Sequence, residues 1–480
     1  MLEKIKKFIP IKLFRALQPP YHFFFSWLAA LIYGFPSRKL IVIGITGTAG
    51  KTSTVYLTAK MLQAAGYKTG FTSTAVFSDG ESEWLNDRKM TMPGRFFIQR
   101  FLRRMVRSRC SYAIVETTSE GIKQFRHRFI NYDVLLFTSL YPEHIESHGS
   151  FAQYREAKGK LFAHIRYGAV KYMNGEHLVV RPHSELKKLD LIRLPKTIIV
   201  NGDDDNADYF LNFWSEAKLV YSFRPEATPE LFLNRLNSEA MVRDFTLLRG
   251  DAVAATAQGT LFTLDGQPVQ LQLLGKFNAD NALAAAAVGR NQNIPPEKIK
   301  TGLEAVRSLA GKLEKIDVGQ DFTAIVDYSF EPKAVEKLYD TAALLPHNRI
   351  IHLLGSAGGG RDKSRRPILG RLAGGKADFV VITNEDPYDE NPAEIINQVA
   401  EGAELAGKEL NKNLFKVMDR REGIRKALEL AEKDDLVLFT GKGAEQYICL
   451  AGGKKLKWDE REVVRAEIVD KLGIDKRKQI

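Results

Sequence analysis

The sequence predicts an α/β protein in which helices cover two parallel sheets. An apolar run, LIVIGITG (40–47), ends in a glycine turn and leads into a helical stretch from Thr52 to Ala65, as a buried strand followed by a crossover helix would. Further apolar runs stop at polar residues, and a second series begins after residue 310. These strand candidates are residues 112–117 and 133–140 in the first series, and 322–328, 349–356, 377–383 and 435–441 in the second. Because parallel strands end at one edge of a sheet, functional groups are expected at that edge.

The order of these segments predicts three regions. They are a basic and apolar helical segment (1–37), a central domain (38–310) and a Rossmann-like C-terminal α/β domain (311–480). Antiparallel strands are expected over residues 240–275, with Asp265-Gly266 as a hairpin turn. An alanine-rich helix is expected to begin at Asn281, and the boundary to the last domain falls near Ala310.

Composition places the chain among ordinary globular proteins. Of its 480 residues, 44% are hydrophobic and 27% are charged, and the formal net charge is +12. A basic balance suits phosphorylated substrates, anionic lipid or nucleic acid. No aromatic-plus-basic signature accompanies the scattered charges, so no nucleic-acid partner is expected. Cys110 and Cys449 offer no disulfide framework, which favours a reducing, cytoplasmic location.

The first 37 residues combine positive charge with apolar side chains. An apolar run from Phe23 to Phe35 follows several basic residues, which are Lys4, Lys6, Lys7, Lys12 and Arg15. The run is shorter than the ~20 residues that span a bilayer. Two interpretations stand side by side. The segment is an interfacial helix that meets anionic lipid at the inner membrane face, or it is a helix packed on the protein's own surface.

Glycines and a Lys-Thr pair mark a phosphate-binding loop between the first strand and its helix. The loop comprises Gly47, Thr48, Ala49, Gly50, Lys51, Thr52 and Ser53. Glycines let backbone N–H groups approach phosphate oxygens, and a helix N-terminus favours negative charge. Lys51 is placed to reach the β- and γ-phosphates and the Thr52 hydroxyl to ligate Mg²⁺. The strict motif has glycine where Ile45 stands, so this is a variant, and it predicts ATP with Mg²⁺.

Other polar groups follow the predicted strands. Glu116 ends a buried strand at the edge where the loop lies, and a carboxylate there suits Mg²⁺. By themselves, His144 in a loop and Lys158 in a helix are typical of structural or solvated residues. GSAGGGRDKSRRP (355–367) is either an anion-facing loop or a basic surface turn. TNEDPYDENP (383–392) either meets an ammonium group or is an acidic surface loop.

In this order the motifs resemble those of the Mur ligases, and most closely the E-type enzymes, over roughly residues 38 to 465. Gly47 to Thr52 match the family's G-T-x-G-K-[ST] loop, with Ala49 where asparagine is common. The resemblance implies a Mur-ligase-like P-loop ATP-binding domain followed by a domain that binds an amino acid. The family usually carries a nucleotide-sugar-binding domain before the loop, and we expect that domain to be lacking here.

The resemblance also implies roles in metal and nucleotide binding. Glu116, with Thr52, matches the magnesium site. His144, in EHIESHG, matches a ligand of a second magnesium, and Lys158 falls on the lysine that the family carbamylates to hold that metal. Lys51, Glu116, His144 and Lys158 are then the catalytic set. The expected nucleotide contacts outside the loop are Asn278, Asn281, Lys312 and Asp327.

Further matches concern a muramoyl peptide and an amino acid. The substrate candidates are Thr91, Ser119, Gln124 and Arg126 in the central domain, and Arg361, Asp362, Glu385, Asp386, Tyr388, Gly441 and Glu445 in the last domain. Lys312 replaces a phosphate-contacting arginine, and Phe330 and Ala444 replace family histidines. Tyr388 replaces the arginine that grips the distal carboxylate of diaminopimelate. The acidic neighbours would then suit a side-chain ammonium, as in L-lysine or ornithine.

The resemblance implies an ATP-dependent, ADP-forming ligase of peptidoglycan biosynthesis. It would add a diamino acid, L-lysine-like or diaminopimelate, to a UDP-N-acetylmuramoyl-dipeptide or related muramoyl peptide through an acyl-phosphate. One alternative is a Mur-like ligase that acts on a lipid-linked precursor or another poly-amino-acid substrate. A P-loop kinase or a non-catalytic ATP-binding partner subunit is the alternative from another class. The expected partners are the muramoyl peptide, the amino acid and, through residues 1–37, the membrane surface.

Overall fold

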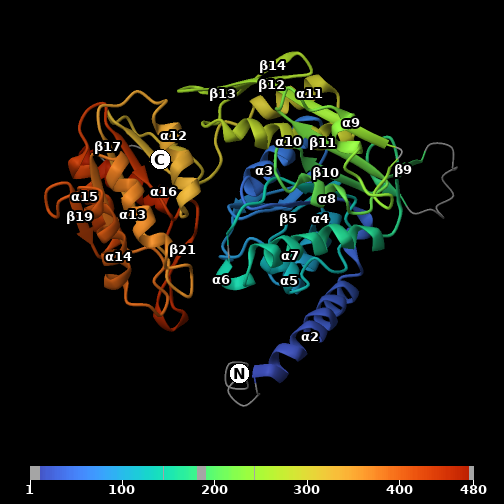
Figure 1. The fold of residues 1–480 in the computed structure, drawn as a ribbon, viewed down its shortest axis with the longest axis horizontal. Helices are drawn as coiled ribbons and strands as arrows, with labels where there is room; N and C mark the ends of the chain where they lie inside the picture. Colours follow the sequence, from blue (N-terminus) through green and yellow to red (C-terminus); the bar gives the residue numbers. More distant parts are fainter. Residues whose placement is uncertain (1–10, 144, 181–190, 243, 475–480) are drawn as a thin grey trace.

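Two α/β bodies lie side by side, and one long helix projects from the larger body (Figure 1). The computed structural model describes residues 11–143, 145–180, 191–242 and 244–474. The larger body contains an 11-stranded sheet and the smaller one a 6-stranded sheet. The predicted fold class, α/β with two mainly parallel sheets, is confirmed.

The large sheet is parallel in its centre and antiparallel at both edges. Its strand order is β14 (Gln267–Leu271), β13 (Gly259–Leu264), β12 (Asp244–Thr256), β11 (Ala217–Ser222), β10 (Thr197–Asn201), β6 (Val134–Phe137), β1 (Ile41–Thr46), β5 (Tyr112–Glu116), β2 (Thr69–Thr72), β3 (Val76–Ser78) and β4 (Glu83–Leu85). The strands from β12 to β2 pair in parallel. The predicted hairpin at Asp265-Gly266 joins β13 to β14, and both turn residues have positive φ, 49° and 77°. Such angles belong to the hairpin turns whose twist matches that of the strands.

Strand β1 shows why the centre of this sheet is covered on both faces. All six of its residues are buried. Ile41, Ile43 and Ile45 pack with helices on one face, while Leu40 and Val42 belong to the core on the other. Side chains alternate across a strand, so a continuous apolar run buries both faces. The first face packs α3 (Lys51–Ala64), α10 (Phe277–Asn291) and α11 (Pro296–Glu304), and the second α4 (Arg95–Arg107), α7 (Phe151–His164) and α8 (Ala207–Leu211).

Short elements complete the larger body. They are η1 (Pro36–Lys39), α5 (Ser119–Lys123), α6 (Ile145–His148), η2 (Ile165–Tyr167), α9 (Pro229–Leu233) and a small sheet of β7 (Lys171–Met173), β8 (Val179–Val180) and β9 (Ile192–Leu194). One sequence expectation was wrong in detail. The alanine-rich helix α10 begins at Phe277 and not at Asn281. Consequently Asn278 and Asn281 lie one turn apart on the same side of that helix.

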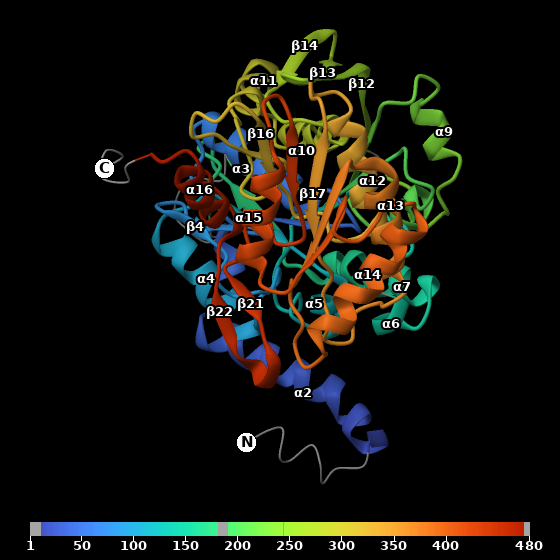
Figure 2. The same ribbon diagram turned by 90° about the vertical axis from the view of Figure 1, so that its left-hand side faces the viewer.

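The second sheet begins at β15 and is parallel except at this edge strand. Its order is β15 (Glu314–Ile316), β16 (Thr323–Val326), β20 (Leu436–Phe439), β17 (Ile350–Leu354), β18 (Phe379–Thr383) and β19 (Leu414–Val417). One face packs α12 (Pro332–Ala342), α13 (Arg365–Lys376) and α14 (Pro392–Leu405), and the other packs α15 (Arg420–Leu430) and α16 (Glu460–Lys471). A hairpin of β21 (Tyr447–Cys449) and β22 (Lys455–Lys457), joined through η3 (Ala451–Gly453), extends downward from this body in Figure 2.

Helix α2 (Ile11–Ile32) combines a packed side with an exposed apolar side. Ser26, Ala29 and Ala30 are buried, and the Ser26 hydroxyl donates to the Phe125 carbonyl at 2.9 Å. In contrast, Phe24 and Leu31 are half exposed. Within the described residues no helix is long and apolar enough to cross a bilayer. The basic residues Lys4, Lys6 and Lys7 lie outside the described part of the chain.

Candidate active site

The predicted phosphate loop joins β1 to α3 at the carboxyl edge of the large sheet. Gly47 has a φ of 158°, and a Cβ there would lie 2.0 Å from the Thr138 hydroxyl. Gly50 caps α3 with a φ of 81°, and a Cβ there would lie 2.5 Å from Asn281 Oδ1. Both positions therefore require glycine, because a side chain would strain the backbone and meet a neighbouring strand or helix. The Lys51 ammonium donates to the carbonyls of Gly47 (3.0 Å) and Thr48 (2.7 Å), so it lies over the loop.

A chain of short contacts links this loop to the predicted substrate loop. The Thr52 hydroxyl donates to the Glu116 carboxylate at 3.1 and 3.0 Å. Glu116 is fully buried and also accepts from the Thr74 amide (2.8 Å) and hydroxyl (3.0 Å). The hydroxyls of Thr74 and Thr91 lie 2.8 Å apart. The structure thus brings together Thr52, Glu116 and Thr91. It adds Thr74, which carries no motif of its own in the sequence.

Glu116 and Thr52 fit a magnesium site. Magnesium takes oxygen ligands and commonly combines one or two carboxylates with phosphate oxygens. A buried carboxylate met only by hydroxyl and amide donors, beside a phosphate loop, is such a ligand set. In the described part of the chain no cluster of three or more His, Cys, Asp or Glu residues makes a self-contained metal cage. The site is therefore suited to a metal that phosphate oxygens and water help to hold.

Lys158, on α7, also contacts the phosphate loop. Its side chain is buried, its ammonium donates to the Gly47 carbonyl at 2.7 Å, and it lies 4.6 Å from the centre of the Tyr154 ring. Burial lowers the pKa of Lys158 well below its usual value, and the nearby charge of Lys51 lowers that pKa further. This environment differs from that of the solvated helix lysine which its local sequence suggested. His144, the other residue predicted for this metal, lies outside the described residues.

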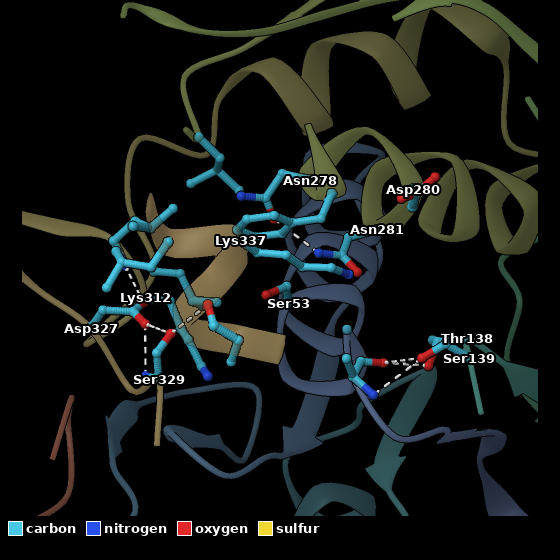
Figure 3. Close-up of a pocket in the computed structure, with 18 of the residues that line it drawn as sticks. Ser53, Thr138, Ser139, Asn278, Asp280, Asn281, Lys312, Asp327, Ser329 and Lys337 are labelled. Carbon is cyan, nitrogen blue, oxygen red and sulfur yellow. Dashed lines mark hydrogen bonds between the residues drawn. The ribbon is translucent and has the colours of Figure 1, made fainter. Parts of the chain in front are cut away.

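A pocket of about 180 Å³ lies between the two bodies at the end of the loop. Figure 3 shows Ser53, Asn278 and Asn281 from the central body facing Lys312, Asp327 and Ser329 from the C-terminal body. Asn281 donates to the side chain of Asn278 at 2.9 Å, so the two predicted nucleotide contacts support each other. Asp280 lines the same pocket, and burial raises its pKa to about 6.

The C-terminal wall of this pocket is organised by Asp327. Its carboxylate accepts from the Leu313 amide at 2.8 Å and from the Ser329 amide at 2.7 Å. The Lys312 ammonium lies 4.6 Å from the centre of the Tyr328 ring. Burial lowers the pKa of Lys312, while Asp327 acts in the opposite direction. The second body therefore contributes one cation, Lys312, and one carboxylate, Asp327, to the lining of the pocket.

The predicted muramoyl-peptide contacts form one surface next to Thr91. Arg126 donates to Gln124 Oε1 at 2.6 Å and to the Met92 carbonyl, so the substrate loop rests on the Gln-Arg pair. Ser119 lies 3.1 Å from His148 Nε2. Phe125, between Gln124 and Arg126, has a φ of 57°, in the left-handed region.

Where the two bodies meet, two acidic residues and two lysines form a buried cluster. Asp386 contacts Lys442 at 3.0 Å and Lys89 at 2.5 Å. Glu445 contacts Lys442 at 2.8 Å and Lys89 at 2.6 Å. Burial would raise the pKa of Asp386, but Lys442 and Lys89 together hold it below its usual value. Lys89 comes from the central body and was not predicted. It places an ammonium group where the sequence predicted that a substrate ammonium would bind.

The remaining predicted residues divide into exposed and buried groups. Arg361 is exposed and lies 5.7 Å from the centre of the Tyr388 ring, while Asp362 accepts from the Ser364 amide at 2.9 Å and shapes the turn before α13. Glu385 is buried, its Oε2 has no hydrogen-bond partner among the described residues, and burial raises its pKa. A Cβ at Gly441 would lie 2.3 Å from that oxygen, so glycine leaves room for the carboxylate.

For residues 355–367 the sequence left two interpretations, an anion-facing loop or a basic surface turn. In the structure only part of this loop is open to an anion. Arg366 is buried and is held by Glu390 at 3.0 Å and Gln398 at 2.8 Å. Lys363 also contacts Glu390, at 3.1 Å. Glu390, from the acidic loop of residues 383–392, therefore pairs with two basic residues of this loop and holds the two loops together. Arg361 remains exposed at the tip.

Residues from both bodies line the pocket. A nucleotide bound there would therefore lie between reactants held by the central domain and reactants held by the C-terminal domain. A phosphate loop that faces a second domain across such a pocket lets domain closure bring two reacting groups together. Comparisons with known proteins agree. The Mur ligase middle domain matches residues 45–289, and the Mur ligase glutamate ligase domain matches residues 311–443.

Two relatives extend this match to most of the chain. A UDP-N-acetylmuramyl-tripeptide synthetase of Roseiflexus sp. (strain RS-1) is 34% identical, over 92% of this chain and 81% of that protein. A UDP-N-acetylmuramoyl-L-alanyl-D-glutamate–2,6-diaminopimelate ligase of Geobacillus kaustophilus (strain HTA426) is 30% identical, over 92% of this chain and 82% of that protein. The chain therefore belongs to the Mur ligase family. It is an ATP-dependent, ADP-forming ligase.

Solved structures show the same fold at lower identity. The folylpolyglutamate synthase of Mycobacterium tuberculosis aligns with a TM-score of 0.62 and 16% identity, over 94% of this chain and 95% of that chain. A UDP-N-acetylmuramoyl-L-alanyl-D-glutamate–2,6-diaminopimelate ligase aligns with a TM-score of 0.55 and 22% identity, over 90% of this chain and 79% of that chain. Both share the fold of a central α/β body followed by a Rossmann-like domain.

Proposed function

We propose that this ligase adds a diamino acid to a muramoyl-dipeptide donor in peptidoglycan biosynthesis. The observation that carries this proposal is the contact chain from Thr52 through Glu116 and Thr74 to Thr91. It joins the phosphate loop directly to the loop expected to hold the donor, whose other side rests on Arg126. A donor carboxylate bound at Thr91 would therefore lie close to the γ-phosphate of ATP bound at the loop.

The reaction has two steps. A donor carboxylate oxygen attacks the γ-phosphorus of ATP, the bond to the bridging oxygen breaks, and ADP leaves. The amine of the amino acid then attacks the acyl-phosphate carbonyl, loses a proton and expels phosphate. Lys51 from one domain and Lys312 from the other neutralise the phosphate charge during the first step. Because the pocket is shared by two domains, their closure also excludes water from the acyl-phosphate.

Thr52 and Glu116 would hold one Mg²⁺, which supplies charge neutralisation at the β- and γ-phosphates. Lys158 and His144 are the proposed ligands of a second Mg²⁺, with Lys158 carbamylated. The geometry supports this for Lys158, because its nitrogen is buried against the Gly47 carbonyl and has no carboxylate partner among the described residues. Carbamylation would convert that buried amine into a carboxylate-like ligand beside the phosphate loop.

The acidic cluster in the C-terminal domain supports a diamino acid. Asp386 and Glu445 already hold a lysine ammonium, that of Lys89, in a buried setting. An amino acid with a side-chain ammonium can take the same place, which favours an L-lysine-like substrate. Diaminopimelate is the second candidate, because Arg361 lies against Tyr388 and supplies a cation near the position of the missing arginine.

We further propose that the enzyme works in the cytoplasm at the inner membrane face. Among the exposed apolar side chains of α2, Leu17, Phe24, Trp27 and Leu31 recur at helical spacing. Basic residues precede them in the sequence, as expected for a helix that lies on an anionic membrane. A membrane-bound donor, the lipid-linked alternative, would then be presented close to the site.

The proposal is tested by phosphate release from ATP with UDP-linked or lipid-linked muramoyl-dipeptide, run against single amino acids. Release that requires both the donor and one diamino acid is expected, and it should fall at least about a hundredfold in Lys158→Ala. Lys160→Ala is the matched control, since this lysine lies on the same helix, is 58% exposed and pairs only with Glu156. Release that ignores the amino acid would instead support a kinase or an ATP-binding partner subunit.

A further inference from the structure

A basic groove lies on the outer side of α4, apart from the nucleotide pocket. Its volume is about 520 Å³. Five arginines line it, which are Arg88, Arg100, Arg103, Arg104 and Arg107, together with the aromatic residues Tyr33, Trp84, Phe97 and Phe101. Asp87 is the one acidic residue of this lining. The groove is therefore strongly positive and has an aromatic floor.

The charge of the groove is largely uncompensated. Arg88 pairs with Asp87 at 3.1 Å, and Arg104 pairs with Asp79. Arg100, Arg103 and Arg107 have no ion pair with any residue in the described part of the chain. Their spacing of three and four residues places all three on one side of α4. Three unpaired guanidinium groups in one row favour an anion with several oxygens, because each can donate two hydrogen bonds to phosphate.

The floor of the groove is built from packed rings. Phe97 stacks on Phe101 with 5.6 Å between ring centres and 15° between planes. Trp84 meets Phe101 edge to face at 5.7 Å, and Arg104 lies 5.1 Å from the Trp84 ring centre. Arg104 and Arg100, which lies 5.8 Å from the centre of the Phe97 ring, are therefore positioned by these rings. The rings also offer apolar surface next to the bound anion.

The groove is connected to the catalytic cleft by the loop between β4 and α4. In this loop Arg88 faces the groove, Lys89 reaches the acidic cluster, and Thr91 contacts Thr74. Arg88 and Thr91 are three positions apart in the sequence, so their Cα atoms are separated by at most about 11 Å. A donor whose carboxylate lies at Thr91 can thus extend along α4 with its far end at the arginines.

The same groove lies at the end of the apolar helix. Tyr33, immediately after α2, lines the groove, and α2 packs against α4. Figure 2 shows β4 and α4 together, with α2 below them. An anion in the groove would therefore lie where the exposed apolar side of α2 meets the central domain.

We propose that this arginine groove binds the diphosphate of the muramoyl donor. The identity of the ligand rests on the proposed function. The inference that the groove binds an anion is supported separately by its charge, its shape and its distance from Thr91. The ligand chemistry is a diphosphate ester. Its second ester group is either a nucleoside, which the ring surface can stack, or a prenyl chain, which α2 can accommodate.

Binding is measured by calorimetry on the full chain with AMPPNP and Mg²⁺ saturating the ATP site, so that the phosphate loop is not titrated. The probes are UDP, farnesyl diphosphate below its micelle concentration, inorganic pyrophosphate and, as the uncharged reference, farnesol. The test variant is Arg100→Gln/Arg103→Gln/Arg107→Gln. The control, Arg307→Gln/Arg371→Gln/Lys376→Gln, removes the same charge from exposed positions elsewhere.

At least one diphosphate ester should bind the native chain, and the groove variant should weaken it at least about tenfold while the control does not. UDP alone would identify a nucleotide-linked donor, and farnesyl diphosphate alone would identify a lipid-linked one. The groove assignment is overturned if no diphosphate binds, or if both variants bind equally. In the phosphate-release assay the groove variant should raise the donor KM and keep kcat. An unchanged KM in an active enzyme overturns the groove only, whereas an inactive native enzyme overturns the proposed function.

Discussion

Lys89 offers a direct test of how the amino acid is selected. Its ammonium lies between Asp386 and Glu445, at 2.5 and 2.6 Å, with a side chain that is 8% exposed. Lys442 contacts the same two carboxylates. The cluster therefore contains two positive and two negative charges. Lys89→Met keeps the length and apolar stem of the side chain but leaves the cluster with one uncompensated negative charge.

The size of the effect follows from this charge balance. In the native enzyme a substrate ammonium must displace Lys89, which exchanges one ion pair for another with little net gain. In Lys89→Met the substrate supplies the missing cation. Breaking a buried ion pair costs about 3–5 kcal/mol. Lys442 still contacts both carboxylates, so we expect the substrate ammonium to regain only about 1.4–2.8 kcal/mol of binding free energy. This corresponds to a KM for L-lysine about 10–100 times lower than that of the native enzyme.

The assay is phosphate release at saturating donor and ATP, with L-lysine, diaminopimelate and L-alanine varied in turn. The KM should fall for the diamino acids and stay constant for L-alanine, which has no second ammonium. Lys68→Met is the matched control, because Lys68 pairs with Glu81 at an exposed site. If Lys89→Met lowers kcat equally for all three amino acids without a selective fall in KM, Lys89 is an interdomain strut and the displacement argument is wrong.

Three further outcomes are expected. Glu116→Gln should lower kcat/KM at least about a hundredfold and raise the Mg²⁺ concentration needed for half-maximal phosphate release, whereas an unchanged Mg²⁺ titration would contradict the metal assignment. Gly47→Ala should weaken AMPPNP binding at least about tenfold by calorimetry, because its Cβ would lie 2.0 Å from the Thr138 hydroxyl. Burial lowers the pKa of His352 to about 3. At pH values below the pKa of an unfolded histidine, the unfolded chain binds a proton at His352 and the folded state does not. The free energy of unfolding therefore decreases as the pH is lowered. Replacement by Gln should remove about 2 kcal/mol of the stability loss between pH 6.5 and 5, measured by urea unfolding.

Local patterns were sufficient for the elements and for the phosphate loop. The run LIVIGITG and the glycines after it lie within one strand and one turn, so the sequence alone determines their geometry. The same is true of the hairpin at Asp265-Gly266, where the turn residues set the backbone angles. The start of α10 was misplaced by one turn, because its first residues carry no alanine signal.

Contacts between distant residues were decided by the tertiary structure. Thr52 and Glu116 are 64 positions apart, and Thr74 enters between Glu116 and Thr91 with no motif of its own. Lys89 and Asp386 are 297 positions apart and belong to different domains. No periodicity or turn chemistry encodes such a pair, because it depends on how two separately folded surfaces meet.

The acidic loop after β18 shows the difference most clearly. In the sequence its four acidic residues look equally able to meet a ligand. In the structure Glu390 is held by Arg366, Asp389 accepts from the Gly452 amide, and Asp386 is shared by two lysines. Glu385 has a buried oxygen without a hydrogen-bond partner among the described residues. By itself the sequence determined the fold class, the phosphate loop and the types of residue available for chemistry. Which of those residues remain available was decided only by packing, since burial pairs most charges inside the protein and leaves few of them for a substrate.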